Sequence, residues 1–452
     1  MWYTSTRGMA PRVNFEGALF SGYAPDGGLY VPEELPQLDR ETLCRWSTLS
    51  YRGLVKELCA LFIGLELIPR QDLNDLIDQA FSRFRHRDVV HLRRLKNELN
   101  VLELWHGVTY AFKDLSLSCT AQFLQYFLQK RKKHVTIVVG TSGDTGSAAI
   151  ESVQGLKNID IIVLLPKGRC TKIQELQMTT VLKENVHVFG VEGNSDELDE
   201  PIKAVFADVA FVQRHNLMSL NSINWSRVLV QMAHHFFAYF QCVPSLNIHP
   251  LPPVEVVVPT GAGGNLAGKE TLGCKWAFRE RRREKTLARK YLYKQSMNSW
   301  TLSRTPSVNH LVYQMLRDSR RFPKRGLSEA VTSESVSDEA ITQTMGRCWE
   351  ENQYLLCPHS ATAVNYHYQQ TDSGQPSSSP SRACKTKDSA KFPEAVQAAG
   401  LAPQTPAEIL GLEHKETRCI PMRRGDDWTQ MLRDTIEGLS QRWEGCAVNT
   451  SE

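Results

Sequence analysis

The sequence of 452 residues lacks the features that mark membrane and secreted proteins. Its apolar runs are short, and the run over 59–68 is interrupted by Glu66, so we expect no membrane span. The amino terminus has no basic stretch followed by an apolar one, so we expect no secretory signal. The eleven cysteines include no Cys-x-x-Cys pair, which favours reduced thiols in the cytoplasm and argues against a zinc ribbon.

Common metal and nucleotide motifs are also missing from the sequence. His234, His235 and His359 do not make a ligand set, so no metal is expected. No Gly-Lys-Ser/Thr triplet is present, which excludes a nucleotide P-loop. Leu266 stands where a dinucleotide fingerprint beginning at Gly261 would require a glycine, so that type of site is excluded too.

The composition is that of a globular protein, with one local anomaly in charge. The length suggests two or three domains with a large core, and no internal repeat is visible. The net charge is +4, but residues 269–325 contain 16 Lys and Arg against 4 Asp and Glu. Blocks of this kind are usually solvated or disordered and sometimes bind nucleic acid.

Hydrophobic periodicity predicts helices first and an α/β pattern afterwards. Residues with helical spacing near the amino terminus are Leu54, Leu58, Leu61, Phe62, Leu73, Ile77 and Phe81. From about residue 86, short apolar runs at 136–139, 161–165 and 254–258 each end in turn residues and precede a helical stretch. Strands that alternate with helices predict a parallel sheet whose ligands bind at the carboxyl ends of the strands. Residues 371–391 are rich in Ser and Pro, which predicts a loop.

One lysine has a setting suited to covalent chemistry. Residues 106–114 read His-Gly-Val-Thr-Tyr-Ala-Phe-Lys-Asp, with Lys113 between an aromatic residue and a carboxylate. A partly desolvated lysine loses its proton readily and becomes a nucleophile towards carbonyl groups. On this stretch alone, a surface lysine that follows a turn is the alternative.

Two polar, glycine-rich loops follow predicted strands. In the loop 259–265, glycines allow main-chain N–H groups to gather around an anion, although a tight turn is an equal alternative. In the loop 140–147, Thr141, Ser142 and Thr145 can donate hydroxyl hydrogen bonds to a carboxylate or phosphate. An N-capped helix with a flexible turn is the alternative there.

Further along the chain, four polar residues have both a functional and a structural interpretation. Asn224 and Arg227 could reach the same anion as the loop 140–147, but a structural salt bridge explains Arg227 equally well. Lys167 is a further basic candidate or a surface residue. Ser360, taken alone, is a helix cap.

Taken in order, these motifs resemble the threonine synthase family of fold-type II pyridoxal-phosphate enzymes. The similarity extends over about residues 1–267 and 327–450, and the animal threonine synthase-like 2 group is the nearest branch. The matching segments are 3–8, 15–19, 24–32, 106–114, 140–147, 165–168, 221–227, 259–265 and 357–361.

The resemblance implies a fold and a division into parts. The fold is α/β, of the tryptophan synthase β-like type, with helices on both faces of parallel sheets and a helical amino-terminal subdomain. The expected parts are an amino-terminal subdomain (1–95), a catalytic region (96–267), a divergent basic segment (268–326) and the rest of the catalytic region (327–452).

The resemblance also assigns roles to residues. Lys113 is expected to hold pyridoxal 5'-phosphate covalently and to act as the general base. Ser360 is expected to meet the pyridine nitrogen. Gly261, Ala262, Gly263 and Asn265 are expected to bind the cofactor's phosphate, although the family usually has Asn-Phe at 262–263. The residues expected to bind the substrate are Thr141, Ser142, Asp144, Thr145, Asn224 and Arg227.

The activity implied is a phospho-lyase reaction on O-phosphohomoserine or O-phosphothreonine, which yields 2-oxobutyrate, ammonia and phosphate. Alternatives are threonine synthesis, serine dehydration, or a catalytically impaired homologue that binds partners through its basic segment. Small phosphorylated amino acids are the expected partners, without membrane or nucleic acid, for a cytoplasmic monomer or homodimer.

One segment departs from the family. After residue 267 the expected helix and strand are replaced by the basic block, and similarity resumes only near Leu327. Alternative splicing or an error in the gene model would produce such a replacement. We expect the loss to cost several kcal/mol, comparable with the whole stability of a domain, and to impair this chain.

Overall fold

The computed structural model of the protein describes all residues except 22, 195–196, 222–223, 249–250, 253, 260–334, 374–381, 387–388 and 450–452. The larger of its sheets is entirely parallel, as the sequence predicts. Its strands, in spatial order, are β11 (Ile420–Met422), β7 (Val186–Val191), β6 (Ile159–Pro166), β5 (Val135–Gly140) and β8 (Leu217–Met218).

This sheet is buried on both faces, which explains why its strands are continuous apolar runs. Ile137 and Val139 of β5 belong to a core that α5, α6 and α10 complete, whereas Val138 between them joins a second core with α8, α9 and α18. The alternation follows from the two-residue period of a strand. The covering helices are α5 (Lys113–Arg131), α6 (Asp144–Val153), α10 (Trp225–Cys242), α8 (Asp199–Ala207), α9 (Val209–Arg214) and α18 (Trp428–Asn449).

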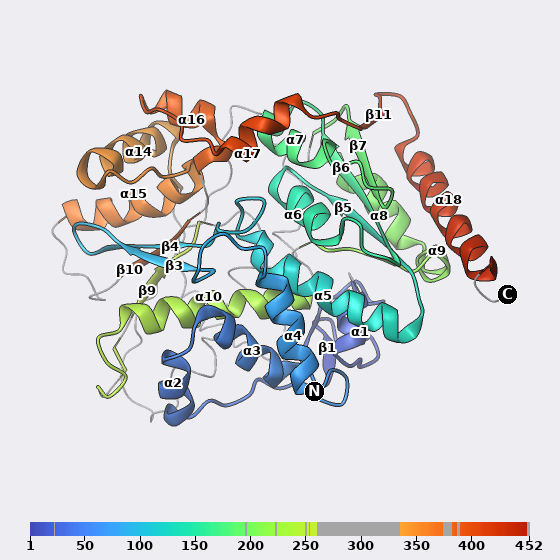
Figure 1. Cartoon of the computed structure of the whole chain (residues 1–452), viewed down its shortest axis with the longest axis horizontal. Helices are drawn as coiled ribbons and strands as arrows, with labels where there is room; N and C mark the ends of the chain where they lie inside the picture. Colours follow the sequence, from blue (N-terminus) through green and yellow to red (C-terminus); the bar gives the residue numbers. More distant parts are fainter. Residues whose placement is uncertain are drawn as a thin grey trace.

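A second sheet has four strands, in the order β3 (His91–Arg94), β4 (Leu99–Glu103), β10 (Arg382–Thr386) and β9 (Glu255–Val257). Only the β3–β4 pair is antiparallel. Helices α14 (Asp338–Asn352) and α15 (Pro358–Asp372) pack on this sheet through a separate apolar core. Figure 1 shows this sheet with α14 and α15 on the left and the five-stranded sheet on the right.

The amino-terminal helices form as the apolar spacing predicts. Helix α3 (Tyr51–Phe62) and α4 (Arg70–Phe81) bury Leu54, Leu58 and Ile77 in the same core as α5 and α10. Ser50 caps α3 by accepting a hydrogen bond from the N–H of Gly53. The other elements are β1 (Tyr3–Ser5), β2 (Tyr30–Pro32), α1 (Phe15–Phe20), α2 (Arg40–Ser47), α7 (Lys172–Thr179), α16 (Pro393–Ala398), α17 (Ala407–Leu410), η1 (Ser389–Lys391) and η2 (Gly411–His414).

The predicted loop at 371–391 is too broad. Strand β10 and the short helix η1 lie inside it, and β10 pairs in parallel with β4 on one side and β9 on the other. The sequence Arg-Ala-Cys-Lys-Thr has no strand-like apolar pattern, so tertiary pairing decides its conformation here.

Of two other expectations, the structure bears on one, and the other concerns residues that it does not describe. Within its described residues, no helix is both long and apolar enough to cross a membrane. The divergent segment 268–326 and the phosphate-loop residues 261–265 lie outside the described residues.

Candidate active site at the carboxyl ends of the strands

Lys113 is the first residue of α5, and the turn that leads to it follows β4. Its side chain is 13% exposed, and its Nζ lies 4.7 Å from the centre of the Phe112 ring. The amine is therefore largely shielded from water but still open on one side. This setting supports the functional interpretation of the lysine over that of a surface residue.

The turn before Lys113 is held by Asp114, which is buried. Its carboxylate accepts the Thr109 N–H at 2.8 Å and the Thr109 hydroxyl at 2.6 Å. Burial raises the pKa of Asp114 to about 6, although the two hydrogen bonds from Thr109 and the nearby charge of Lys391 act in the opposite direction. A Cβ at Gly107 would collide with this carboxylate, which explains the glycine in the motif.

Arg85 fixes the other side of the turn. Its guanidinium donates to the carbonyls of Gly107 and Val108, and it lies 4.2 Å from the centre of the Tyr110 ring. Tyr110 has a left-handed backbone (φ 57°), which is uncommon for a bulky residue, and its hydroxyl donates to Glu408 at 2.5 Å. The turn is thus held in a strained conformation by several contacts beyond its own backbone.

Asp144 lies opposite Lys113, at the first position of α6 and directly after β5. A carboxylate at this position is favoured by the helix dipole. Gly143 before it has a φ of 139°, and a Cβ there would come within 2.5 Å of the Gln174 side chain. The close approach lets Gln174 donate from Nε2 to Asp144 Oδ1 at 2.8 Å.

Asp144 contacts two lysines, one at each of its carboxylate oxygens. Lys113 Nζ lies 3.3 Å from Oδ2, and Lys391 Nζ lies 2.9 Å from Oδ1. Lys391 is only 1% exposed, and it also donates to the carbonyl of Thr109 at 2.8 Å. The sequence gives no signal for Lys391, because a single lysine in Ser-Ala-Lys-Phe matches no pattern.

The predicted substrate loop is only partly free to bind a ligand. The Thr141 hydroxyl oxygen accepts the N–H groups of Gly143 and Gly146, so it helps to build the loop and keeps one proton to donate. Ser142 is exposed, and Thr145 is half-buried. These two hydroxyls are the more accessible candidates for an anion.

Asn224 and Arg227 are buried in structural contacts. Asn224 caps α10 by accepting the N–H of Ser226, and its amide donates to the carbonyl of Leu19. Arg227 donates to the carbonyl of Leu220 at 2.9 Å, and burial lowers its pKa to about 10. Among the described residues no carboxylate pairs with Arg227, so the salt-bridge alternative is not what holds it there.

Ser360 lies in the first turn of α15, and its side chain is fully buried. Its hydroxyl is 3.1 Å from the sulfur of Cys357, and Cys357, not Ser360, caps the helix. The neighbouring His359 ring contacts that of Phe392, the residue after Lys391, with centres 4.9 Å apart. The late motif therefore lies beside the segment that supplies Lys391.

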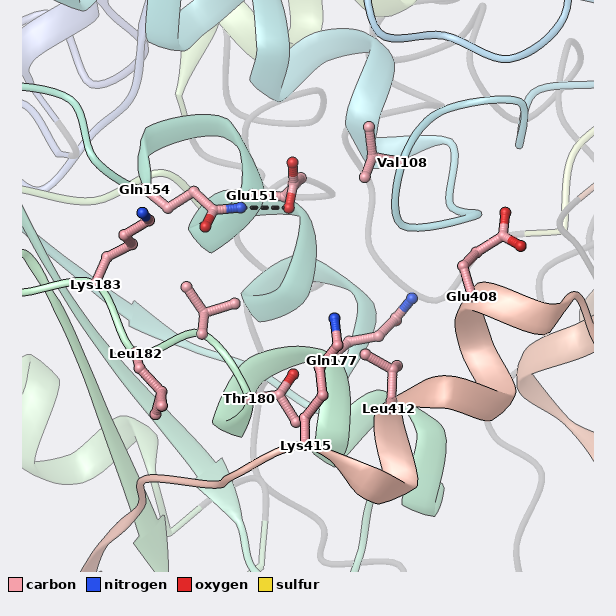
Figure 2. Close-up of a pocket in the computed structure, with 11 residues that line it drawn as sticks. Val108, Glu151, Gln154, Gln177, Thr180, Leu182, Lys183, Glu408, Leu412 and Lys415 are labelled. Carbon is pink, nitrogen blue, oxygen red and sulfur yellow. Dashed lines mark hydrogen bonds between the residues drawn. The ribbon is translucent and has the colours of Figure 1, made fainter.

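A cavity of about 420 Å³ lies next to the turn, between α6, α7 and the α17–η2 segment (Figure 2). Val108 and Gln177 line it together with Glu151 and Glu408, and Gln177 also donates to the carbonyl of Thr109. Neither Lys113 nor Asp144 lines this cavity. It is a neighbour of the candidate site and not the site itself.

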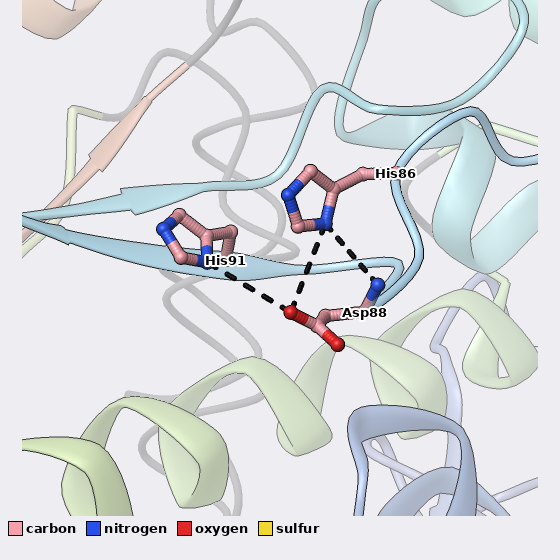
Figure 3. Close-up of side chains that lie close together, drawn as sticks. All are labelled: His86, Asp88 and His91. Carbon is pink, nitrogen blue, oxygen red and sulfur yellow. Dashed lines mark hydrogen bonds and ion pairs between the residues drawn. The ribbon is translucent and has the colours of Figure 1, made fainter.

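Histidines cluster at the other end of the motif (Figure 3). The Nδ1 atoms of His86 and His91 each lie 4.0 Å from Asp88 Oδ2, and His86 Nδ1 accepts the N–H of Asp88. Ligands on a tetrahedral zinc ion would be about 3.5 Å apart or less. The His106 ring contacts that of His86 in a tilted arrangement, with centres 4.5 Å apart, and its Nε2 lies 3.0 Å from Glu103 Oε2. We assign no metal to this cluster, and the expectation of no metal remains a prediction.

The arrangement fits a cofactor that has an aldehyde and an anionic group. Lys113, Asp144 and Lys391 follow the carboxyl ends of β4, β5 and β10, which is where ligands bind in parallel α/β folds. A shielded amine is available for the aldehyde, and the loop 259–265 follows the neighbouring strand β9. Fold and site together define a fold-type II pyridoxal-phosphate enzyme.

Comparisons with known proteins agree with this class. The profile of the threonine synthase amino terminus matches residues 2–81, and that of pyridoxal-phosphate dependent enzymes matches 87–378. Threonine synthase-like 2 of Rattus norvegicus is 76% identical, with all of both chains covered. Threonine synthase of Saccharomyces cerevisiae is 36% identical over 80% of this chain and 82% of its own. The crystal structure of threonine synthase with bound pyridoxal phosphate from Brucella melitensis superposes with a TM-score of 0.81 at 28% identity, covering 97% of this chain and 99% of that one.

The chain belongs to the threonine synthase family of pyridoxal-phosphate dependent enzymes, and its cofactor is pyridoxal phosphate. The predicted fold class and the predicted similarity to threonine synthase-like 2 proteins are confirmed. The alignment with the rat protein takes 486 positions for the 452 residues of this chain, so it includes positions at which this chain has no residue.

Proposed function

We propose that the protein eliminates phosphate from O-phosphorylated amino acids. O-phosphohomoserine or O-phosphothreonine, with one water, would give 2-oxobutyrate, ammonia and phosphate. The observation that carries this proposal is the shielded amine of Lys113 next to Asp144, at the strand ends of a fold in this family. The high identity to threonine synthase-like 2 supports a reaction on a phosphorylated amino acid.

Five groups of residues would divide the work. Lys113 would hold the cofactor, the loop 261–265 would bind its phosphate, and Ser360 would meet its ring nitrogen. When bound, pyridoxal phosphate supplies an electron sink for negative charge at the substrate's Cα. The Lys113 amine takes the proton from Cα as a general base, and Asp144 Oδ2 orients that amine. Ser142 and Thr145 donate hydrogen bonds to the anionic substrate.

The charges of the site are compatible with an anionic substrate. Each carboxylate oxygen of Asp144 faces a lysine, so this carboxylate is paired within the described part of the site. In a shielded site, an unpaired carboxylate would repel a carboxylate or phosphate more strongly than it would in water. Phosphate is also a good leaving group. In O-phosphothreonine it leaves Cβ after the loss of the Cα proton, whereas in O-phosphohomoserine a second proton must leave Cβ before phosphate departs from Cγ.

Threonine synthesis is the second candidate. The similarity to the yeast and Brucella threonine synthases favours it. Starting from O-phosphohomoserine, water would add to the substrate carbon chain and give threonine and phosphate. The placement of one water molecule separates this outcome from the lyase reaction.

Measuring all products from each substrate distinguishes the candidates. The full chain is incubated with O-phosphohomoserine, O-phosphothreonine and serine, and phosphate, 2-oxobutyrate, threonine and pyruvate are quantified. We expect equal amounts of phosphate and 2-oxobutyrate from the phosphorylated substrates. Threonine in place of 2-oxobutyrate would favour the synthase, and 2-oxobutyrate formation is not possible from serine, which would give pyruvate instead.

Variants link the activity to the site. Lys113→Ala should abolish product formation. It should also abolish the label that borohydride reduction leaves on the 106–114 peptide when pyridoxal phosphate is attached there. Lys172→Ala, at a 68%-exposed lysine of α7, is the matched control and should keep both. Attachment at another lysine in a folded sample would contradict the proposal. We also propose a cytoplasmic location, since the eleven cysteines are scattered without any Cys-x-x-Cys pair.

A further inference from the structure

Lys391 has no role in the reaction described so far, although its position is unusual. A lysine that is 1% exposed must have its charge compensated, because a buried ammonium without partners is strongly unfavourable. Its partners are Asp144 Oδ1 at 2.9 Å and the carbonyl of Thr109 at 2.8 Å. Both belong to segments that surround Lys113, so Lys391 is directed at this site rather than at the general core.

The two lysines compete for one negative charge. Among the described residues, Asp144 is the carboxylate that contacts Lys113, and Lys391 contacts its other oxygen. With Asp144 alone, Lys113 would be held as an ammonium ion, which is neither a nucleophile nor a base. A second cation close by favours the neutral amine, since like charges disfavour each other's charged forms.

We propose that Lys391 is a positioning residue that keeps the amine of Lys113 neutral and reactive. Asp144 orients the amine of Lys113. Lys391 offsets the negative charge of Asp144, which would otherwise keep that amine protonated. The inference rests on the proposed role of Lys113 as the cofactor lysine.

In the part of the chain that the structure describes, the other charged groups around the pair do not provide this effect. Asp114, on the same helix as Lys113, turns its carboxylate to Thr109 and lies close enough to Lys391 for their charges to interact. From α7, Gln174 contacts Asp144 with a neutral amide. Among the described residues that contact Asp144, Lys391 is therefore the one cation besides Lys113.

The test measures the reactivity of Lys113 against pH, without any turnover. The full chain, freed of cofactor, is labelled with an amine-reactive reagent at a series of pH values, and the 106–114 peptide is quantified by mass spectrometry. Lys391→Met removes the charge and keeps the length of the side chain. We expect the midpoint of the Lys113 curve to rise by about one to two pH units, so that labelling near pH 7 falls at least about tenfold.

Three further variants separate charge from structure. Lys391→Arg keeps the charge and should leave the midpoint within about half a pH unit of the parent. Lys391→Gln removes the charge but keeps donors for Asp144 and Thr109, so it should behave as Lys391→Met does. Lys172→Met makes the same change at an exposed lysine and should have no effect.

The outcomes distinguish this inference from the proposed function. If pyridoxal phosphate attaches to a lysine other than Lys113 in the unaltered chain, the proposed function fails. If it attaches to Lys113 but the midpoint stays unchanged or falls in folded Lys391→Met or Lys391→Gln, only the role of Lys391 fails. Unfolding of both neutral variants would make Lys391 a folding residue and would also overturn the inference.

Discussion

Replacing Asp114 by asparagine should change the way in which the free energy of unfolding depends on pH. Asp114 is buried below the turn that leads to Lys113, and it accepts two hydrogen bonds from Thr109. Burial raises its pKa to about 6 from the usual value of 3.8. The folded protein therefore keeps this proton in a pH range where the unfolded chain has lost it.

The sign and size of the effect follow from this difference. Between about pH 4 and pH 6 the native state binds more protons than the unfolded state, so stability falls as the pH rises. The contribution is fully present below the unfolded pKa and is lost as the pH passes through the folded one. A difference of about two pKa units corresponds to about 3 kcal/mol in total.

Urea denaturation of the parent and of Asp114→Asn at a series of pH values measures this directly. The variant cannot titrate at this position, so its stability relative to the parent should rise by about 2 kcal/mol between pH 4 and pH 7. A constant loss of about 1–3 kcal/mol is superimposed, because the new amide group cannot accept both donors of Thr109. A stability difference that is flat with pH, or that falls towards pH 7, would refute this account of the buried carboxylate.

Two further changes test other parts of the site and its sheet. Gly143→Ala places a Cβ within 2.5 Å of Gln174 at a φ of 139°, so it should destabilise the loop by about 1–3 kcal/mol and weaken retention of pyridoxal phosphate, measured by dialysis and absorbance. Asp160→Asn should show the opposite pH trend to Asp114→Asn. Burial acts to raise the pKa of Asp160, but hydrogen bonds with His134 and His187 outweigh it and lower the pKa to about 2. This carboxylate therefore contributes about 2 kcal/mol above pH 4 that is lost as the pH falls towards 2, and equal acid sensitivity of parent and variant in urea denaturation would contradict it.

The sequence predicts best the strands of the sheet that is buried on both faces. Apart from Thr136, the runs 136–139 and 161–165 are apolar at every position because both faces of their sheet are covered, and they appear as β5 and β6. Strand β10 gives no such signal, since its conformation depends on β4 and β9, which are far away in the sequence. Periodicity reports local burial, and it cannot report pairing of this kind.

In the candidate site, too, the sequence predicts some residues and gives no signal for others. Lys113 and Asp144 follow motifs and lie together in the structure. Asn224 also belongs to a motif, yet its side-chain oxygen caps α10 and its side-chain nitrogen donates to the carbonyl of Leu19. A residue of a family motif can therefore have a structural role. Lys391 has no motif, and its importance arises only from the 2.9 Å contact that folding creates.

Lys391 comes from a part of the chain almost 250 residues beyond Asp144. A nascent polypeptide can form the β5–β6 pair long before residue 391 has been synthesised, but the turn at 106–112 then lacks its contacts with Lys391 and Glu408. On the role proposed for Lys391, the Lys113 amine would stay protonated until then and would be a poor nucleophile towards an aldehyde. Loading of the cofactor would thus wait for near-complete translation.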